Sequence, residues 1–258
     1  MKNQYVPLVL VCVLLLFSLK AKSQIVNIEK QRSSTSDSIL WTGHINLGFN
    51  LVENNKTIIT VNGDMRHDFS KNRHLFLSIS KYNLGKVDNE DFLNDGFQHF
   101  RYNYSLNKWM TWEAFTQIQY NERINLKMRW LLGSGPRFTL VEEDRYQLFL
   151  GTLYMYEYGR ETEGESTETV VHRDHRMSNY ISISLQPVDN LEFHNTSYFQ
   201  PLISDFSDLR LSSESNLLIK ITERLRFSSV FSIVYDSRSP EGVPSTIYRF
   251  SNGVRWEF

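Results

Sequence analysis

Two histidines in the one markedly acidic stretch of the chain are the first candidates for chemistry. His172 and His175 flank Asp174. Further carboxylates precede them at Glu161, Glu163, Glu165 and Glu168. Imidazole and carboxylate groups both bind divalent cations, but the spacing here matches no defined metal site. We therefore interpret the stretch as a solvated acidic loop and predict no metal ligands.

A possible hydrolytic constellation lies in the same region. Ser178, His175 and Asn179 fall within five residues of one another. A nucleophile, its base and an orienting group must meet in one site. Adjacent residues of an extended strand point to opposite faces, so Ser178 and Asn179 do not share a face unless a bulge intervenes. We assign no catalytic residue and expect the chain not to be an enzyme.

Gly133 and Gly135 raise a third possibility, a glycine-rich phosphate cradle. Their neighbours alternate in the manner of a strand, and no helix pattern follows them. A phosphate-binding loop needs that helix. The two glycines are better explained by a bulge or by close packing within a strand. We predict no cofactor.

Composition narrows the classes of function further. The 258 residues carry 28 Lys+Arg and 29 Asp+Glu, so the chain has no basic field for nucleic acid. The single cysteine, Cys12, lies in an apolar run near the N-terminus, which leaves the rest without a thiol. Aromatic residues make up 14% although the mean hydropathy is only −0.38. Transmembrane barrels combine polarity and aromatic content in this way.

The first residues have the pattern of an export signal. One early cation, Lys2, precedes an apolar run from Val6 to Leu19, and small residues follow at Ala21 and Ser23. The run is shorter than the roughly 20 residues of a membrane-spanning helix. We predict a cleaved signal peptide at 1–23, a flexible polar lead-in at 24–37 and one barrel domain at 38–258.

After the lead-in, apolar residues recur at every second position. Trp41, Ile45 and Phe49 share one face of the first such segment, whereas His44 and Asn46 share the other. This period indicates β-strands. Twelve segments follow the pattern, near 41–51, 58–69, 74–82, 97–104, 109–121, 126–140, 146–158, 177–186, 191–200, 209–221, 225–236 and 248–258.

Turn positions give an independent check, because a hairpin must pair residues of the same face. A turn centred on Asn55 pairs Phe49 with Val61, both apolar. A turn centred on Glu223 places Arg210 opposite Asp236. A charge-swap double-mutant cycle would test that pair. Connections near residues 85–95, 159–174, 201–208 and 237–245 are expected to be long and to share one end of the barrel.

The cations and carboxylates within these segments fall on the polar face. A lipid-facing Arg or Lys near the membrane midplane costs about 2–4 kcal/mol, which explains their placement. The resulting lumen-facing candidates are Asp64, Arg66, Arg101, Glu113, Lys127, Arg129, Glu157, Arg210, Glu214, Asp236, Arg249 and Arg255. The predicted fold is an all-β, closed antiparallel transmembrane β-barrel of about 12 strands. A soluble lipocalin-like barrel or secreted sandwich, with its apolar face inward, is the alternative.

The last five residues alternate and end on an aromatic. Val254, Trp256 and Phe258 share the apolar face. This ending resembles the C-terminal signal by which outer-membrane barrels are recognised for assembly. It predicts the barrel-assembly machinery and outer-membrane lipid as partners and the bacterial outer membrane as the location; it does not predict an oligomeric state.

One internal stretch resembles a known family. The run from Trp112 to Asn121, followed by Arg129 and by Leu132 to Arg137, is similar to the uncharacterised family typified by salt-induced outer-membrane β-barrel proteins. The resemblance covers most of the chain after the N-terminal signal. It implies the barrel fold and an envelope location, and it brings no assigned catalytic residues.

Two classes of function stay open on the sequence. A polar interior of about twelve strands can form a narrow, porin-like channel or a small-solute binding barrel, and the sequence does not decide between them. An outer-membrane lipid-modifying enzyme, or a structural or stress-related envelope protein, is the alternative.

Overall fold

The computed structural model describes residues 40–88, 90–162, 169–240 and 242–256. The predicted signal peptide and lead-in, and Phe258, lie outside this range. The described chain forms twelve strands: β1 (Leu40–Glu53), β2 (Thr57–Lys71), β3 (His74–Val87), β4 (Glu90–Ser105), β5 (Met110–Asn121), β6 (Leu126–Glu143), β7 (Tyr146–Thr162), β8 (Thr169–Val188), β9 (Leu191–Leu202), β10 (Asp205–Lys220), β11 (Leu225–Asp236) and β12 (Thr246–Trp256).

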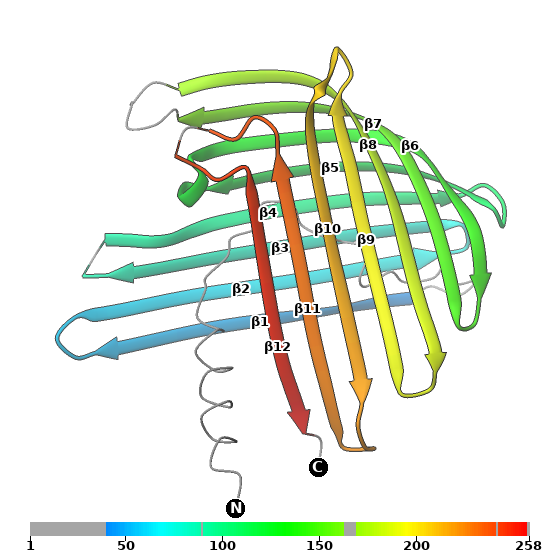
Figure 1. Cartoon of the computed structure of the whole chain (residues 1–258), viewed down its shortest axis with the longest axis horizontal. Coiled ribbons are helices and arrows are strands. Elements are labelled where there is room, and N and C mark those ends of the chain that lie inside the picture. The colour runs from blue at the N-terminus through cyan, green and yellow to red at the C-terminus, as the bar shows by residue number, and fades with distance from the viewer. Residues whose placement is uncertain (1–39, 89, 163–168, 241, 257–258) are drawn as a thin grey trace, which may run out of the picture.

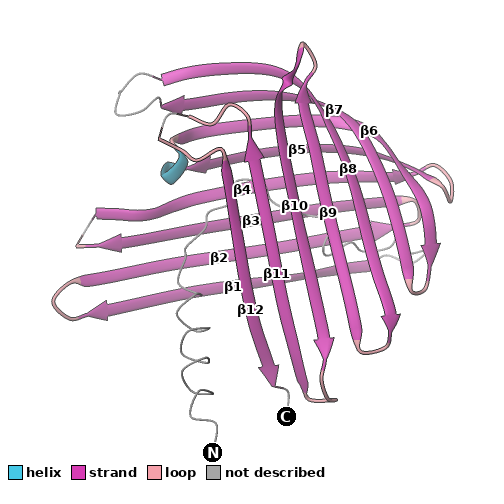
Figure 2. Ribbon diagram, viewed as in Figure 1, coloured by secondary structure: helices cyan, strands magenta, loops and turns pink. Residues whose placement is uncertain are grey.

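All twelve strands belong to one antiparallel sheet, and their order in the sheet is their order in the chain (Figures 1 and 2). The all-β prediction and the number of strands are confirmed. Closure of the sheet differs from the prediction: among the described residues β1 pairs only with β2, and β12 only with β11. The sheet is strongly curved, and β1 and β12 are its two open edges (Figure 1).

The registers derived from turn parity are those of the structure. Phe49 pairs with Val61 across the first hairpin. Arg210 pairs with Asp236 between β10 and β11. The turns use residues that tolerate a left-handed backbone, as at Asn72, whose φ is 52°. Side-chain alternation and turn chemistry therefore specified the same pairing.

Several of the long connections expected at one end are absent. β3 and β4 continue to Val87 and Glu90, and β9 and β10 approach to Leu202 and Asp205. β11 ends at Asp236 and β12 begins at Thr246, so that connection is long as expected, and residues 163–168 of another expected connection lie outside the described residues. In the extensions the apolar alternation fades, yet backbone pairing continues, and Lys86 forms an ion pair with Asp91 at 3.2 Å. Polar residues that continue a backbone ladder thus looked like a loop in the sequence.

One predicted position departs from the alternation because of a β-bulge. The β6–β7 register shifts between Leu126 and Met128. Leu126 is buried like Arg129, although the two lie three positions apart and a regular strand would place them on opposite faces. The intervening Lys127 is exposed. The prediction that Lys127 shares the polar interior face is therefore corrected by the extra residue of the bulge.

The two faces of the sheet have opposite character. In β5, Glu113, Gln117 and Asn121 are buried, whereas Trp112 and Ile118 are exposed. The same inversion runs along the other central strands. Large apolar side chains on the exposed face include Phe76, Phe100, Trp130, Leu132, Leu150, Tyr154, Ile181, Phe199, Leu211 and Phe231. A protein in water would bury such residues and expose the charged ones.

Candidate functional site: a polar interior with an apolar constriction

Contacts between distant strands show which face is enclosed. The Tyr180 hydroxyl in β8 donates to Glu113 Oε2 in β5 at 2.7 Å. Three strand steps separate β5 from β8, or roughly 14 Å along a flat sheet. Such a bond can form only on the concave side of a curved sheet. The polar face is therefore the interior.

A buried carboxylate on this interior face is held by three arginines. Glu157, which is 1% exposed, lies 2.9 Å from Arg129 Nε, 3.2 Å from Arg176 Nε and 2.6 Å from Arg210 Nη1. The three arginines come from β6, β8 and β10. Buried charges persist only when they are paired and hydrogen-bonded. The cluster thus ties four strands together across the concave side.

The arginines of this cluster reach further carboxylates. Arg129 Nη2 donates to Glu161 at 3.0 Å, and Arg176 Nη2 donates to Asp208 at 2.9 Å. Arg210 Nε donates to Asp236 Oδ2 at 2.7 Å, the pair that turn parity had placed opposite each other. Charges of both signs therefore alternate through the interior.

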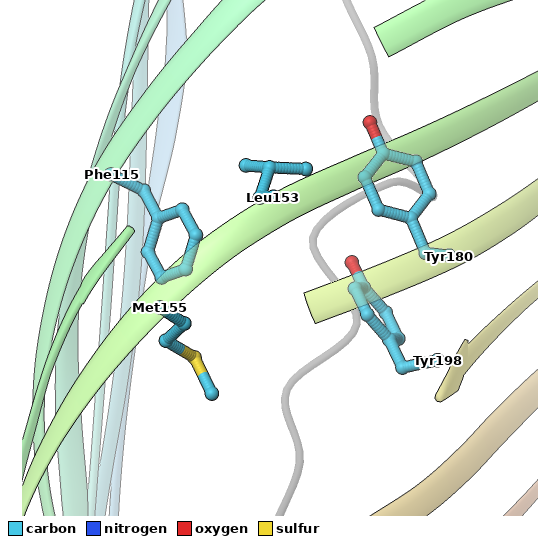
Figure 3. Packing of buried hydrophobic residues seen from close by; sticks show 5 residues of the cluster. All are labelled: Phe115, Leu153, Met155, Tyr180 and Tyr198. Atoms are coloured by element: carbon cyan, nitrogen blue, oxygen red, sulfur yellow. The ribbon is translucent and has the colours of Figure 1, made fainter. Parts of the chain in front are cut away.

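An apolar cluster lies beside these charges. Phe115, Leu153, Met155, Tyr180 and Tyr198 are all buried and pack together (Figure 3). They project from β5, β7, β8 and β9 into the space enclosed by the sheet. We call these five side chains the constriction. Side chains therefore fill this part of the interior.

Glycines make room for the rings of the constriction. A Cβ atom on Gly133 would lie 2.4 Å from the Phe115 ring, and one on Gly151 would lie 2.1 Å from the Tyr180 ring. Real Cβ contacts are not that short, so each ring lies directly over a glycine. The sequence-based interpretation of Gly133 as a site of close packing is confirmed.

A small cavity adjoins the constriction. It has a volume of about 50 Å³. Polar groups make up much of its wall, and Gln200 Nε2 donates to Ser178 Oγ at 3.0 Å there. The remaining polar lining includes His99, Gln117, Gln119, Arg129 and Arg210. The cavity has room for a water-sized or similarly small polar guest.

The family to which the chain belongs can now be stated. The pattern of the family described as "Protein of unknown function, DUF481" matches residues 45–258. The chain belongs to the DUF481 family. No curated protein matches the chain.

Two solved structures are similar to this DUF481 protein in outline. The NanC porin is 12% identical, with a TM-score of 0.48 over 86% of this chain and 100% of its own. The translocator domain of the autotransporter NalP from Neisseria meningitidis is 13% identical, with a TM-score of 0.31 over 84% and 82%. At these scores neither likeness carries an argument about this DUF481 protein. No helix in the described chain is long and apolar enough to cross a membrane.

The structure brings many of the predicted interior residues of the DUF481 protein together. Arg66, Arg101, Glu113, Arg129, Glu157 and Asp236 are buried, and Arg210 joins Glu157 to Asp236. Asp64 and Glu214 are half-buried. Asp64 accepts hydrogen bonds from Asn46. Their placement in a closed lumen stays a prediction.

The candidates in β12 are not buried in the way that the interior candidates of the central strands are. Arg249 is exposed, because β12 is an edge strand with one neighbour. Arg255 pairs with Arg226 in the backbone register. Val254 and Trp256 are exposed, as are most described residues of β12. Their role in assembly stays a prediction.

The metal and hydrolase constellations do not assemble among the described residues. His172 Nε2 lies 3.8 Å from Glu161, but no group of three or more potential ligands gathers in the described chain. Glu163, Glu165 and Glu168 lie outside the described residues. Ser178 is buried in the interior, whereas His175 bonds to Tyr154 on the opposite face.

The sequence analysis did not single out several residues of the interior network. Arg176 is 1% exposed and Asp208 is buried with it. Asp208 lies in a stretch that was expected to be loop, and Arg176 lies just before the segment predicted to begin at residue 177. Asp68 and Arg137 also face the interior. The sequence did contain a signal for these two residues. Asp68 and Arg137 lie an even number of positions after Arg66 and Arg129, which places each on the same strand face as a predicted interior residue.

Proposed function

We propose that this DUF481 protein is an outer-membrane barrel whose strands close around a narrow polar lumen, and that it binds or passes small polar solutes. One observation carries the proposal: the enclosed face holds the paired charges around Glu157, while the outer face presents apolar and aromatic side chains. Lipid is the environment in which that distribution is favourable.

Closure of the barrel follows from the same physics. In hydrocarbon every backbone N–H and C=O group needs a partner, so open strand edges do not persist there. The edges of β1 and β12 are those that would have to meet. Leu47 in β1 is 84% exposed and Val254 in β12 is 67% exposed, as expected of lipid-facing positions beside such a seam.

The interior supports a narrow passage rather than a wide pore. The constriction fills part of the enclosed space, and the adjoining cavity measures only about 50 Å³. Amide, hydroxyl and guanidinium groups line that cavity, which suits a small polar solute. Binding or slow permeation fits this geometry better than the enzyme alternative, since Ser178 and His175 lie on opposite faces.

Two measurements test the proposal. The full chain, expressed in a Gram-negative host, should fractionate with the outer membrane and migrate faster on gels before heating than after it. Recovery as a detergent-free soluble protein would overturn the membrane assignment. In planar bilayers we expect small, infrequent conductance steps or none, with retention of small polar solutes by the purified protein. Large, steady steps would contradict the narrow lumen.

A further inference from the structure

A hollow on the exposed face lies near one end of the sheet. Its volume is about 540 Å³, within the range of about 300–1,000 Å³ found for small-ligand sites. Large side chains form its walls: Trp41, Phe69, Phe76, Phe100, Tyr102 and Leu132. Small side chains form its floor: Ser78, Ala114 and Thr116. We call this hollow the aromatic groove.

Polar groups border the groove where its strands turn. Tyr102 lines the groove, and its hydroxyl bonds to His74 Nδ1 at 2.8 Å. The His74 ring also contacts the ring of Tyr104, with centroids 5.1 Å apart. His74 pairs with Lys71 at the last step of the β2–β3 hairpin. From the groove towards the turn, the side chains therefore change from apolar rings to the polar His74 and then to the cation Lys71.

Three cations lie in the two neighbouring turns next to this end of the groove, and we call them the basic turn cluster: Lys71, Arg73 and Lys108. All three are exposed. The two turns that carry them touch, because Ser105 N donates to Arg73 O at 2.9 Å. The segments 69–76 and 102–112 contain no Asp or Glu. None of the three cations forms an ion pair with a residue of the described chain.

Cations in the other turns at the same end are arranged differently. Arg145 binds Asp189 at 2.6 Å, and Lys220 binds Glu223 at 2.8 Å. Carboxylates therefore neutralise those turns from within the chain. The basic turn cluster keeps its charge available for an anion that comes from outside.

We infer that the aromatic groove and the basic turn cluster together form a binding site for one anionic phospholipid. An acyl chain lies in the groove, and the headgroup phosphate lies against Lys71, Arg73 and Lys108. This inference rests on the proposed function, since it needs the exposed face to meet lipid. The tight turns mark the periplasmic end of such a barrel, so the lipid belongs to the leaflet on that side.

The test uses the full-length protein purified from membranes in detergent. Phosphatidylglycerol and phosphatidylethanolamine are added separately, and bound lipid is counted by native mass spectrometry. The wild type should retain phosphatidylglycerol preferentially. Each of Lys71→Gln, Arg73→Gln and Lys108→Gln should weaken that preference by about fivefold. Arg224→Gln, in another turn of the same end, is the matched control and should change nothing.

A second arm separates a lipid from a free phosphate. Ala114→Phe fills the floor of the groove and should release phosphatidylglycerol while leaving the cations in place; Thr116→Phe serves if the first variant does not fold. Millimolar inorganic phosphate should not displace the lipid. Displacement by phosphate, with no effect of filling the groove, would overturn the inference.

The outcomes also distinguish this site from the proposed function. A protein that fractionates with the outer membrane but retains the two lipids equally keeps the proposed function and loses the lipid site. A protein that is soluble without detergent loses both.

Discussion

At the scale of the residue, the central feature is Glu157, whose carboxylate is shared by three arginines. Arginines from three strands converge on it, and its side chain is almost fully buried. Replacing a buried pair by apolar groups can be neutral, but removing one partner leaves uncompensated charge. This carboxylate is therefore important for stability because it is buried among three arginines, not because of its effect on the net charge of the protein.

The Glu157→Gln substitution should be strongly destabilising. It keeps the side-chain volume but removes the charge that three arginines share, and we expect a loss of about 3–5 kcal/mol in the free energy of unfolding. Urea titration of the detergent-solubilised protein, followed by circular dichroism, measures the loss. Glu192→Gln, at a part-exposed position, is the control. A change below about 0.5 kcal/mol at Glu157 would refute the central role.

The Arg210–Asp236 pair can be isolated by a double-mutant cycle. Arg210 also binds Glu157 at 2.6 Å, so a charge swap would place two carboxylates together. The neutral variants Arg210→Gln and Asp236→Asn avoid that repulsion. We expect a coupling energy of about 0.5–3 kcal/mol from the same urea titrations. Additive effects of the two substitutions would show that the pair is not coupled.

At the scale of the element, each strand separates two environments. β1 illustrates this, because Asn46 lies on the side of Asp64 while Leu47 points away from it. The bulge in β6 shows how one added residue shifts the pattern, since it buries Leu126 and exposes Lys127. The alternation of inward and outward side chains therefore holds only between bulges.

A pair of neighbouring arginine substitutions tests the two faces of β1. Leu47→Arg should destabilise the membrane-inserted protein by about 2–4 kcal/mol if Leu47 meets lipid near the midplane. Asn46→Arg, one residue away, should cost much less because its side chain meets the polar interior. Refolding into lipid vesicles under graded urea compares them. Equal costs would contradict the assignment of the faces.

At the scale of the whole molecule, the enclosed side chains determine how much free space the interior leaves. The constriction draws residues from β5, β7, β8 and β9, and Gly133 and Gly151 allow its rings to lie flat against the sheet. Opening it requires removing bulk from the interior without breaking the charge network.

The Met155→Ala variant should widen the passage. Met155 is fully enclosed in the constriction and bears no hydrogen bond that the charges require. We expect larger or more frequent conductance steps in planar bilayers, with some loss of stability, about 2–5 kcal/mol. Met177→Ala, on the opposite face of the neighbouring strand, is the control. Unchanged conductance in a folded variant would place the barrier elsewhere.

The sequence by itself determined the local features of this protein. Twelve alternating segments, the registers around Asn55 and Glu223, and the burial of charges such as Glu113 all follow from the two-residue period of a strand. These features depend on neighbours in the chain or across one hairpin, so local pattern was sufficient.

Only the tertiary structure decided which distant residues meet. The Tyr180–Glu113 bond and the Arg210–Glu157 ion pair join strands that are not neighbours in the sheet, and the aromatic groove combines side chains from the six strands β1 to β6. The bulge at Lys127 and the extensions that carry Arg176 and Asp208 were also invisible to a periodicity test. Curvature of the sheet brings these groups together, and curvature is a property of the whole sheet rather than of any one segment.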